Sequence, residues 1–247
     1  MKANQTQLDA LVARMLAGSK AALAKLITLV ETQGCDVPEL MTKIVPHSGK
    51  AYRIGVTGPP GAGKSTLTNA LIAVARSHGL SVGVVAVDPS SAIHGGAVLG
   101  DRIRMQPHFL DSQVFIRSMA TRGSPVGLPT CIGDVTKLLD AFGKDIVIVE
   151  TVGVGQLDLS VMEVADTVLL VLTPDYGDTI QLMKAGIIEI ADIIAVNKAD
   201  THAAEGLISR LRSVLSNTER PPVILATEAL NNVGIEELFA ELEKHRK

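Results

Sequence analysis

The chain has 247 residues, of which 47% are apolar and only 2% aromatic. The net charge of −3 and the pI near 6.1 give no basic surface of the kind that binds nucleic acid or acidic lipid. No apolar run reaches the roughly 18 residues that a transmembrane helix needs, and the N-terminus lacks the layout of a signal peptide. We therefore expect a cytoplasmic protein with no nucleic acid and no membrane among its partners.

The first part of the chain predicts helices. Apolar residues recur at helical spacing from Leu8 to Leu16 and again from Leu23 to Val30. The strand pattern that follows starts near residue 52. We therefore expect an N-terminal helical extension over residues 1–48.

The next stretch, GPPGAGKS from Gly58 to Ser65, fits the pattern of a phosphate-binding loop. An apolar run that predicts a buried strand precedes it, and an apolar helical pattern that stops at Gly79 follows it. Glycines let backbone N–H groups close around phosphates, and the start of the helix adds partial positive charge. We expect Lys64 to reach the β- and γ-phosphates and the Ser65 hydroxyl to bind Mg²⁺. The expected phosphate-binding residues are Gly58, Pro59, Pro60, Gly61, Ala62, Gly63, Lys64, Ser65 and Thr66.

Beyond this loop, runs that predict strands alternate with helical patterns. Such alternation predicts an α/β fold of the P-loop NTPase type, with a doubly wound, mostly parallel sheet behind the helical extension. Ligands of such sheets bind beyond the carboxyl ends of the strands. The expected domain covers residues 49–247. Strands are predicted at 52–57, 82–87, 114–117, 145–150, 167–172, 193–197 and 223–226, and the clearest later helices at 203–215 and 235–245.

The tetrapeptide Asn197-Lys198-Ala199-Asp200 follows a predicted strand and suits guanine. One carboxylate can accept hydrogen bonds from both the ring N–H and the exocyclic amine of guanine, whereas adenine presents no such donor pair. We therefore expect GTP and GDP as ligands, held by Asn197, Lys198 and Asp200. A backbone N–H for the guanine oxygen is expected just past the next strand, although a simple turn into the last helix is an alternative there. The candidates for it are Thr227, Glu228 and Ala229.

Three carboxylates are candidates to complete the Mg²⁺ site with Ser65: Asp88, Asp101 and Glu150. Mg²⁺ takes hard oxygen ligands and keeps several waters, so one or two carboxylates suffice. A turn aspartate is the alternative for Asp88, and a helix N-cap is the alternative for Asp101. Glu150 begins the pattern E-x-x-G, where many GTPases have D-x-x-G. The N–H of Gly153 is expected to contact the γ-phosphate and to lose this contact when GTP is hydrolysed.

Residues that sense or turn over the nucleotide are expected outside the strands. The segment 89–112 has no clear periodicity, as in a nucleotide-sensing loop, and it carries Arg102 and Arg104. An arginine can offset transition-state charge, although a solvated or salt-bridged arginine is the alternative for each of them. Gln156 is the nearest candidate to position water, with a surface residue as the alternative. The expected catalytic residues are thus Lys64, Glu150 and Gln156.

With its motifs in this order, the chain resembles the MeaB/ArgK family of P-loop GTPases, the chaperones associated with methylmalonyl-CoA mutase. The resemblance covers most of residues 8–245 and extends well beyond the nucleotide motifs. The blocks that carry it are 87–91, 95–105, 116–123, 150–156 and 177–192.

The resemblance implies a slow GTPase that binds an adenosylcobalamin-dependent acyl-CoA mutase. It implies that the protein gates cofactor loading, protects the mutase and helps to replace damaged cofactor. It also implies an extra switch over residues 173–184, in which Asp178 and Lys184 couple the nucleotide to the mutase. Larger relatives carry further C-terminal helices that form a dimer arm. The resemblance therefore predicts a compact form without that arm, and leaves a monomer and a weak homodimer both open.

Two other functions remain open at this point. A P-loop kinase for a small molecule would use the same phosphate loop to transfer phosphate to an acceptor. A regulatory binding module would bind GTP and GDP with Mg²⁺ and show negligible turnover. The identity of the acyl-CoA mutase also stays open.

Overall fold

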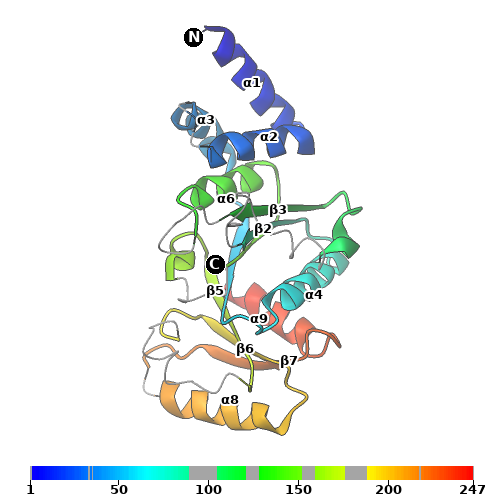
Figure 1. Cartoon of the computed structure of the whole chain (residues 1–247), viewed down its shortest axis with the longest axis vertical. Helices are drawn as coiled ribbons and strands as arrows, with labels where there is room; N and C mark the ends of the chain where they lie inside the picture. The colour runs from blue at the N-terminus through cyan, green and yellow to red at the C-terminus, as the bar shows by residue number, and fades with distance from the viewer. Residues whose placement is uncertain are drawn as a thin grey trace, which may run out of the picture.

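The computed structural model describes residues 2–32, 34, 36–88, 105–120, 128–151, 159–175, 188–216 and 218–246. At its centre lies a seven-stranded sheet with the order β3-β2-β4-β1-β5-β6-β7, and each neighbouring pair is parallel (Figure 1). The predicted α/β fold is confirmed, with a strand at each of the seven predicted positions. The strands are β1 Tyr52–Thr57, β2 Val82–Asp88, β3 Val114–Ala120, β4 Ile146–Glu150, β5 Thr167–Leu172, β6 Ile193–Asn197 and β7 Val223–Thr227.

Helices cover both faces of the sheet. Every residue of β4, β5 and β6 is buried, as expected for parallel strands between two helical layers. The helices are α1 Lys2–Leu16, α2 Lys20–Glu31, α3 Val37–Ile44, α4 Lys64–Ser77, α6 Ile132–Ala141, α8 His202–Leu215 and α9 Ile235–His245. Short 3₁₀ helices are η1 Val45–His47, η2 Gln106–His108 and η3 Leu159–Glu163.

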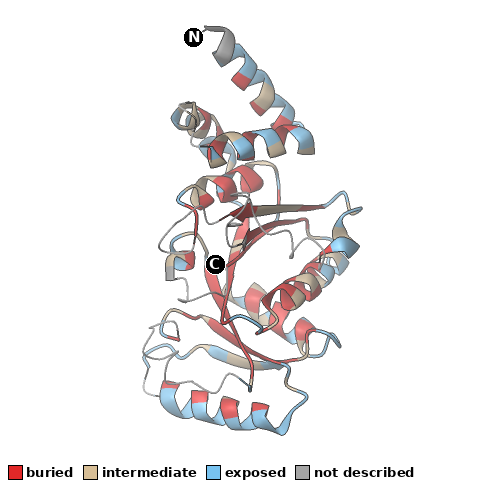
Figure 2. Ribbon diagram, viewed as in Figure 1, coloured by how far each residue is buried: buried red, intermediate tan, exposed pale blue. Residues whose placement is uncertain are grey.

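The alternation of side chains along β5 shows how the two layers form. Leu169 and Val171 point into a core that α4 and α9 complete. Leu170 and Leu172 point to the opposite face, where they meet α8. Figure 2 shows the buried residues of α8 along the side that faces the sheet, with exposed residues on its other side. Every second side chain of β5 therefore faces the apolar side of α8, and the two sets of side chains form one core.

The three N-terminal helices pack in series: α1 contacts α2 and α3, and these two contact α6, which in turn packs on β4 of the sheet (Figure 1). Ser19 caps α2, since its Oγ accepts a hydrogen bond from the Ala22 N–H at 3.3 Å. Leu23 and Ile27 of α2 are completely buried and belong to the same core as Val85 of β2. The extension and the sheet thus share one hydrophobic core. The boundary at residues 48 and 49 stays a prediction.

Helix α2 also holds the edge strand β3 through polar contacts. Lys20 Nζ donates to the carbonyl oxygens of Asp111 at 3.2 Å and Val114 at 2.8 Å. Further along the strand, Arg117 forms an ion pair with Glu31 of α2. The helix therefore contacts β3 both at its start and near its middle.

In the described part of the chain, no helix has both the length and the apolar character that crossing a bilayer requires.

Replacing Gly55 of β1 by alanine is expected to destabilise the fold. A Cβ at this position would lie 2.4 Å from Cγ2 of Val161 and 3.0 Å from Cβ of Ala165, so η3 would have to move. Overpacking of this kind costs about 1–3 kcal/mol of unfolding free energy, which urea denaturation can measure.

Two further variants make this test specific. Gly55→Ala combined with Val161→Ala is expected to be more stable than the sum of the two single effects, because the second change removes the clashing methyl groups. Gly206→Ala is the matched control: a Cβ at Gly206 in α8 meets nothing within 4 Å, so helix propensity should stabilise this variant by up to about 1 kcal/mol. Strict additivity of the first pair would contradict the steric explanation.

Candidate nucleotide-binding site

The loop between β1 and α4 lies at the carboxyl edge of the sheet, where the strands end. Its glycines Gly58, Gly61 and Gly63 have φ angles of +145°, +76° and +87°, which side-chain-bearing residues rarely adopt. Space is a second constraint at two of them. A Cβ on Gly58 would lie 2.1 Å from the carbonyl oxygen of Val171, and one on Gly63 would lie 2.4 Å from Nδ2 of Asn197. The loop therefore needs glycine at both positions.

Lys64 is the first residue of α4 and is buried. Its Nζ donates to the carbonyl oxygens of Gly58 at 2.9 Å and Pro59 at 3.1 Å. The amine is thus folded back over its own loop, next to the positive end of α4. An anion bound here would interact with the Lys64 amine more strongly than the two neutral carbonyl oxygens do, because its charge is opposite to that of the amine and of the helix start.

Ser65 and Glu150 meet beside this lysine. Ser65 Oγ donates to Oε1 of Glu150 at 2.5 Å, and both residues are buried. The strand register explains the encounter, because Glu150 ends β4 and pairs with Val56 of β1 and Ala86 of β2. A hydroxyl and a carboxylate are hard oxygen ligands of the type that Mg²⁺ prefers, so this pair fits such an ion.

The other predicted metal ligands are only partly placed. Asp88 ends β2, two residues beyond the point where β2 pairs with Glu150, but its side chain lies outside the described part of the structure. The third carboxylate predicted for the metal site and the remaining predicted switch and catalytic residues also lie outside it. These are Asp101, Arg102, Arg104, Gly153, Gln156, Asp178 and Lys184.

Two buried threonines at this edge were not predicted from the sequence. Thr151 follows Glu150 directly, and its hydroxyl donates to Oγ1 of Thr57 at 3.1 Å. The Thr151 N–H donates to the Val56 carbonyl oxygen at 2.9 Å. These contacts hold the ends of β1 and β4 together under the loop. The available signal was their position: both residues lie at the ends of apolar strands.

The predicted base-binding residues other than Thr227 line a pocket of about 200 Å³, whereas Thr227 is buried and does not line it. Lys198 and Asp200 are exposed along it, and Lys198 has a left-handed φ of +58°. Leu230 also lines the pocket and is 84% exposed, a residue that sequence reasoning missed. The lining consists of Gly63, Thr66, Asn197, Lys198, Asp200, Glu228, Ala229, Leu230 and Asn231.

Asn197 connects this pocket to the phosphate-binding loop. Its Nδ2 donates to the Ala62 carbonyl oxygen at 2.9 Å. Its Oδ1 accepts from the Ala229 N–H at 3.0 Å and from the Thr227 hydroxyl at 3.4 Å. The side chain therefore braces three segments. A base oxygen would have to compete with Asn197 for the Ala229 N–H.

The parallel sheet, the glycine loop, the buried lysine and the Ser65–Glu150 pair together define the P-loop NTPase class. The family described as methylmalonyl-CoA mutase-associated GTPase MeaB matches residues 23–247. The chain belongs to this family, and it is therefore a GTPase.

Individual relatives agree with this assignment. A protein of Pyrococcus abyssi that is provisionally named a GTPase is 50% identical over 248 residues, which cover 97% of this chain and 76% of that protein. A mitochondrial protein of Caenorhabditis elegans named methylmalonic aciduria type A homolog is 39% identical over 201 residues, covering 75% of this chain and 50% of that protein. Among solved structures, one named LAO/AO transport system kinase is similar, with a TM-score of 0.77 and 30% identity over 97% of this chain and 75% of that one.

Proposed function

We propose that this GTPase is a chaperone for an adenosylcobalamin-dependent acyl-CoA mutase, which gates loading of the cofactor, protects the mutase and helps to reactivate it. The observation that carries the proposal is the match over residues 23–247 to a family whose description names methylmalonyl-CoA mutase. The name of the Caenorhabditis elegans relative, which refers to methylmalonic aciduria, supports the same metabolic context. We place the protein in the cytoplasm.

In this proposal the described site binds GTP and GDP with Mg²⁺. The loop from Gly58 to Ser65 surrounds the phosphates, and Lys64 moves from its two carbonyl partners to the phosphate oxygens. Ser65 and Glu150 hold Mg²⁺, together with Asp88 or Asp101. When bound, Mg²⁺ offsets the negative charge of the phosphates. The surrounding buried groups keep the hydroxyl and the carboxylate in place.

The guanine base is proposed to bind in the pocket beside Asn197. Asp200 accepts hydrogen bonds from guanine, and the stem of Lys198 lies beside the base. Asn197 acts chiefly through the brace that it forms with Ala62 and Ala229. Thr227 and Glu228 complete the loop that positions this brace.

The response to the nucleotide is proposed to come from residues beyond the described part. Gly153 and Gln156 follow Glu150 closely in sequence, so they are placed to report on the γ-phosphate and on the attacking water. Arg102, Arg104, Asp178 and Lys184 are proposed to couple this state to the mutase. Hydrolysis without the partner is expected to be slow.

Adding a cobalamin-dependent acyl-CoA mutase is expected to accelerate phosphate release by about tenfold or more, equivalent to about 1.4 kcal/mol of transition-state stabilisation. Methylmalonyl-CoA mutase is the first one to test. Phosphate release is followed with and without the mutase, and the complex is captured with a non-hydrolysable GTP analogue. Lys64→Ala serves as the control that should lose the nucleotide-dependent part of the effect.

The other outcomes of this experiment identify the alternatives. Phosphate that appears on an added small-molecule acceptor would identify a kinase. Tight nucleotide binding without turnover, even with the mutase, would identify a regulatory binding module. If no cobalamin mutase changes turnover or is captured, the chaperone proposal is wrong.

A further inference from the structure

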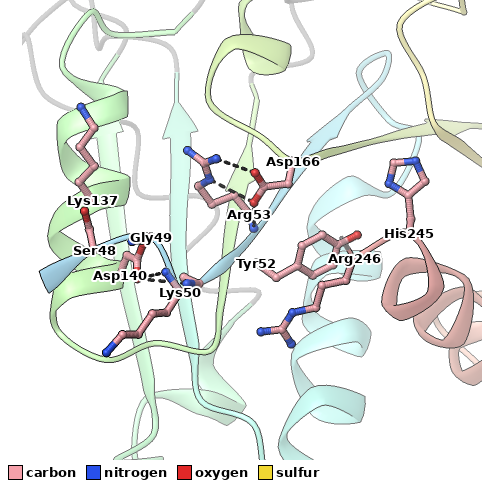
Figure 3. Close-up of a pocket in the computed structure, with 11 residues that line it drawn as sticks. Ser48, Gly49, Lys50, Tyr52, Arg53, Lys137, Asp140, Asp166, His245 and Arg246 are labelled. Carbon is pink, nitrogen blue, oxygen red and sulfur yellow. Dashed lines mark hydrogen bonds and ion pairs between the residues drawn. The ribbon is translucent and has the colours of Figure 1, made fainter. Parts of the chain in front are cut away.

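A second and larger cavity, of about 480 Å³, lies at the opposite edge of the sheet, where the strands begin (Figure 3). Its walls come from the stretch before β1, the starts of β1 and β5, helix α6 and the end of α9. Since β1 has six residues, roughly 20 Å separate this cavity from the phosphate-binding loop at the strand's other end. The lining residues are Ser48, Gly49, Lys50, Ala51, Tyr52, Arg53, Lys137, Asp140, Asp166, His245 and Arg246.

The two acidic residues of this cavity are already engaged within the protein. Asp140 accepts from the backbone N–H groups of Gly49 at 2.5 Å and of Lys50 and Ala51 at 3.1 Å each. Asp166 accepts from Arg53 through the backbone N–H at 2.8 Å and through two guanidinium nitrogens at 3.1 and 2.5 Å. Both carboxylates are therefore compensated, and Arg53 is compensated as well.

His245 is engaged too. Its Nδ1 lies 2.7 Å from Oγ1 of Thr167, and its Nε2 lies 3.4 Å from Oδ1 of Asp192. Both ring nitrogens therefore have partners outside the cavity, so His245 is part of the wall and not a free donor.

The remaining cations lack partners of comparable strength. Among the described residues, Lys50 forms no ion pair. Lys137 and Arg246 form ion pairs of 3.4 and 3.6 Å with acidic residues three positions earlier in the chain. Exposed pairs of this kind contribute about 0–1 kcal/mol. Burial would raise the pKa of the Asp145 carboxyl, but hydrogen bonds from Ser81 lower it, and Arg246 lies close enough to lower it as well. The cavity is thus positive within a chain whose net charge is −3.

Arg246 is also held in a fixed place. Its guanidinium lies over the ring of Tyr52, 5.7 Å from the centroid. The Tyr52 hydroxyl, in turn, donates to the Leu242 carbonyl oxygen at 2.8 Å and so fixes the last turn of α9. In Figure 3 the side chains of Lys50 and Arg246 both extend towards the bottom of the view. A cation held on a rigid support loses little entropy when it binds a ligand.

We propose that this cavity binds a small anion that carries carboxylate or phosphate groups, with Lys50 and Arg246 as its principal partners. The volume lies within the range of small-molecule sites, and the unmatched charge selects for negative ligands. The site is separate from the nucleotide-binding site, and both can be filled at once. This proposal does not depend on the mutase as partner.

The test uses protein saturated with GDP and Mg²⁺, so that the phosphate-binding loop is already occupied. Inorganic phosphate and succinate are titrated separately by calorimetry, which distinguishes the two sources of negative charge. At least one anion is expected to bind saturably. Lys50→Gln and Arg246→Gln are each expected to weaken it about tenfold, as for loss of one charge-assisted hydrogen bond.

Lys244→Gln is the matched control, since Lys244 lies on α9 close to Arg246 but does not line the cavity. It is expected to leave anion affinity unchanged, and all three variants should keep the GDP affinity of the parent. If Arg246→Gln lowers the melting temperature, its loss of anion affinity is not specific evidence for the site. The anion affinity of Lys50→Gln then decides the test, because Lys50 is exposed and its replacement should not disturb the fold. Absence of saturable binding by both anions, or an equal loss in Lys244→Gln, would overturn the proposal.

Discussion

Replacing Asp200 by asparagine is expected to weaken GDP binding on the order of 10³-fold, because two hydrogen bonds to a charged acceptor are lost. A carboxylate accepts from both the ring N–H and the amine of guanine. The asparagine amide offers one acceptor, and its NH₂ group faces the guanine amine. Xanthine carries an oxygen in place of that amine, so xanthosine diphosphate should gain affinity for the variant.

Displacement of a fluorescent nucleotide by GDP, xanthosine diphosphate and ADP measures this exchange of selectivity. Asp134→Asn on α6 is the matched control, since it makes the same chemical change outside the base pocket. It should leave all three affinities unchanged. If Asp200→Asn keeps its GDP affinity within about twofold, Asp200 does not read guanine, and the base must be selected elsewhere.

Replacing Glu150 by glutamine is expected to slow GTP hydrolysis on the order of 10²-fold at limiting Mg²⁺, since a neutral amide is a poor ligand for a hard cation. The glutamine oxygen still accepts the Ser65 hydroxyl, so the local structure should persist. Glu150 is only 2% exposed. Removing a buried charge should therefore leave the nucleotide-free protein as stable as the parent or more stable.

Two measurements separate these effects. Hydrolysis as a function of Mg²⁺ concentration should show a higher half-maximal concentration for Glu150→Gln, and thermal melting should show a smaller stabilisation by Mg²⁺ with GDP. Glu163→Gln on the exposed surface of η3 is the control and should change neither. An unchanged Mg²⁺ dependence in Glu150→Gln would remove Glu150 from the metal site.

Much of the fold follows from local patterns in the sequence. The strands β4, β5 and β6 are continuous apolar runs, and such runs are buried in a parallel sheet between helices. The glycine loop is equally local, because its positive φ angles and the helix start are set within eight residues of each other. These features do not depend on distant parts of the chain.

The contacts that organise the site depend on distant residues and could not be predicted in the same way. The motif predicts that Asn197 lies beside the base, but it does not predict the hydrogen bond from the Asn197 amide to the carbonyl oxygen of Ala62, 135 positions earlier. Asp140 holds the backbone of Gly49 from 91 positions away. The cavity at the start of the strands is assembled from several such segments. Sequence periodicity indicates which face of an element is buried, but not which partner it meets.

The two edge strands of the sheet carry different features that disfavour pairing with a further strand. The Val82 N–H bonds the Gln113 carbonyl oxygen, so the next carbonyl along β3, that of Val114, points outward, and Lys20 occupies it. At the other end, β7 has only five residues and directly follows two prolines, which have no N–H to offer. The unpaired N–H and C=O groups of an exposed edge strand can form hydrogen bonds with a strand of another molecule. These features make edge-to-edge pairing between the sheets of two copies of this protein less favourable.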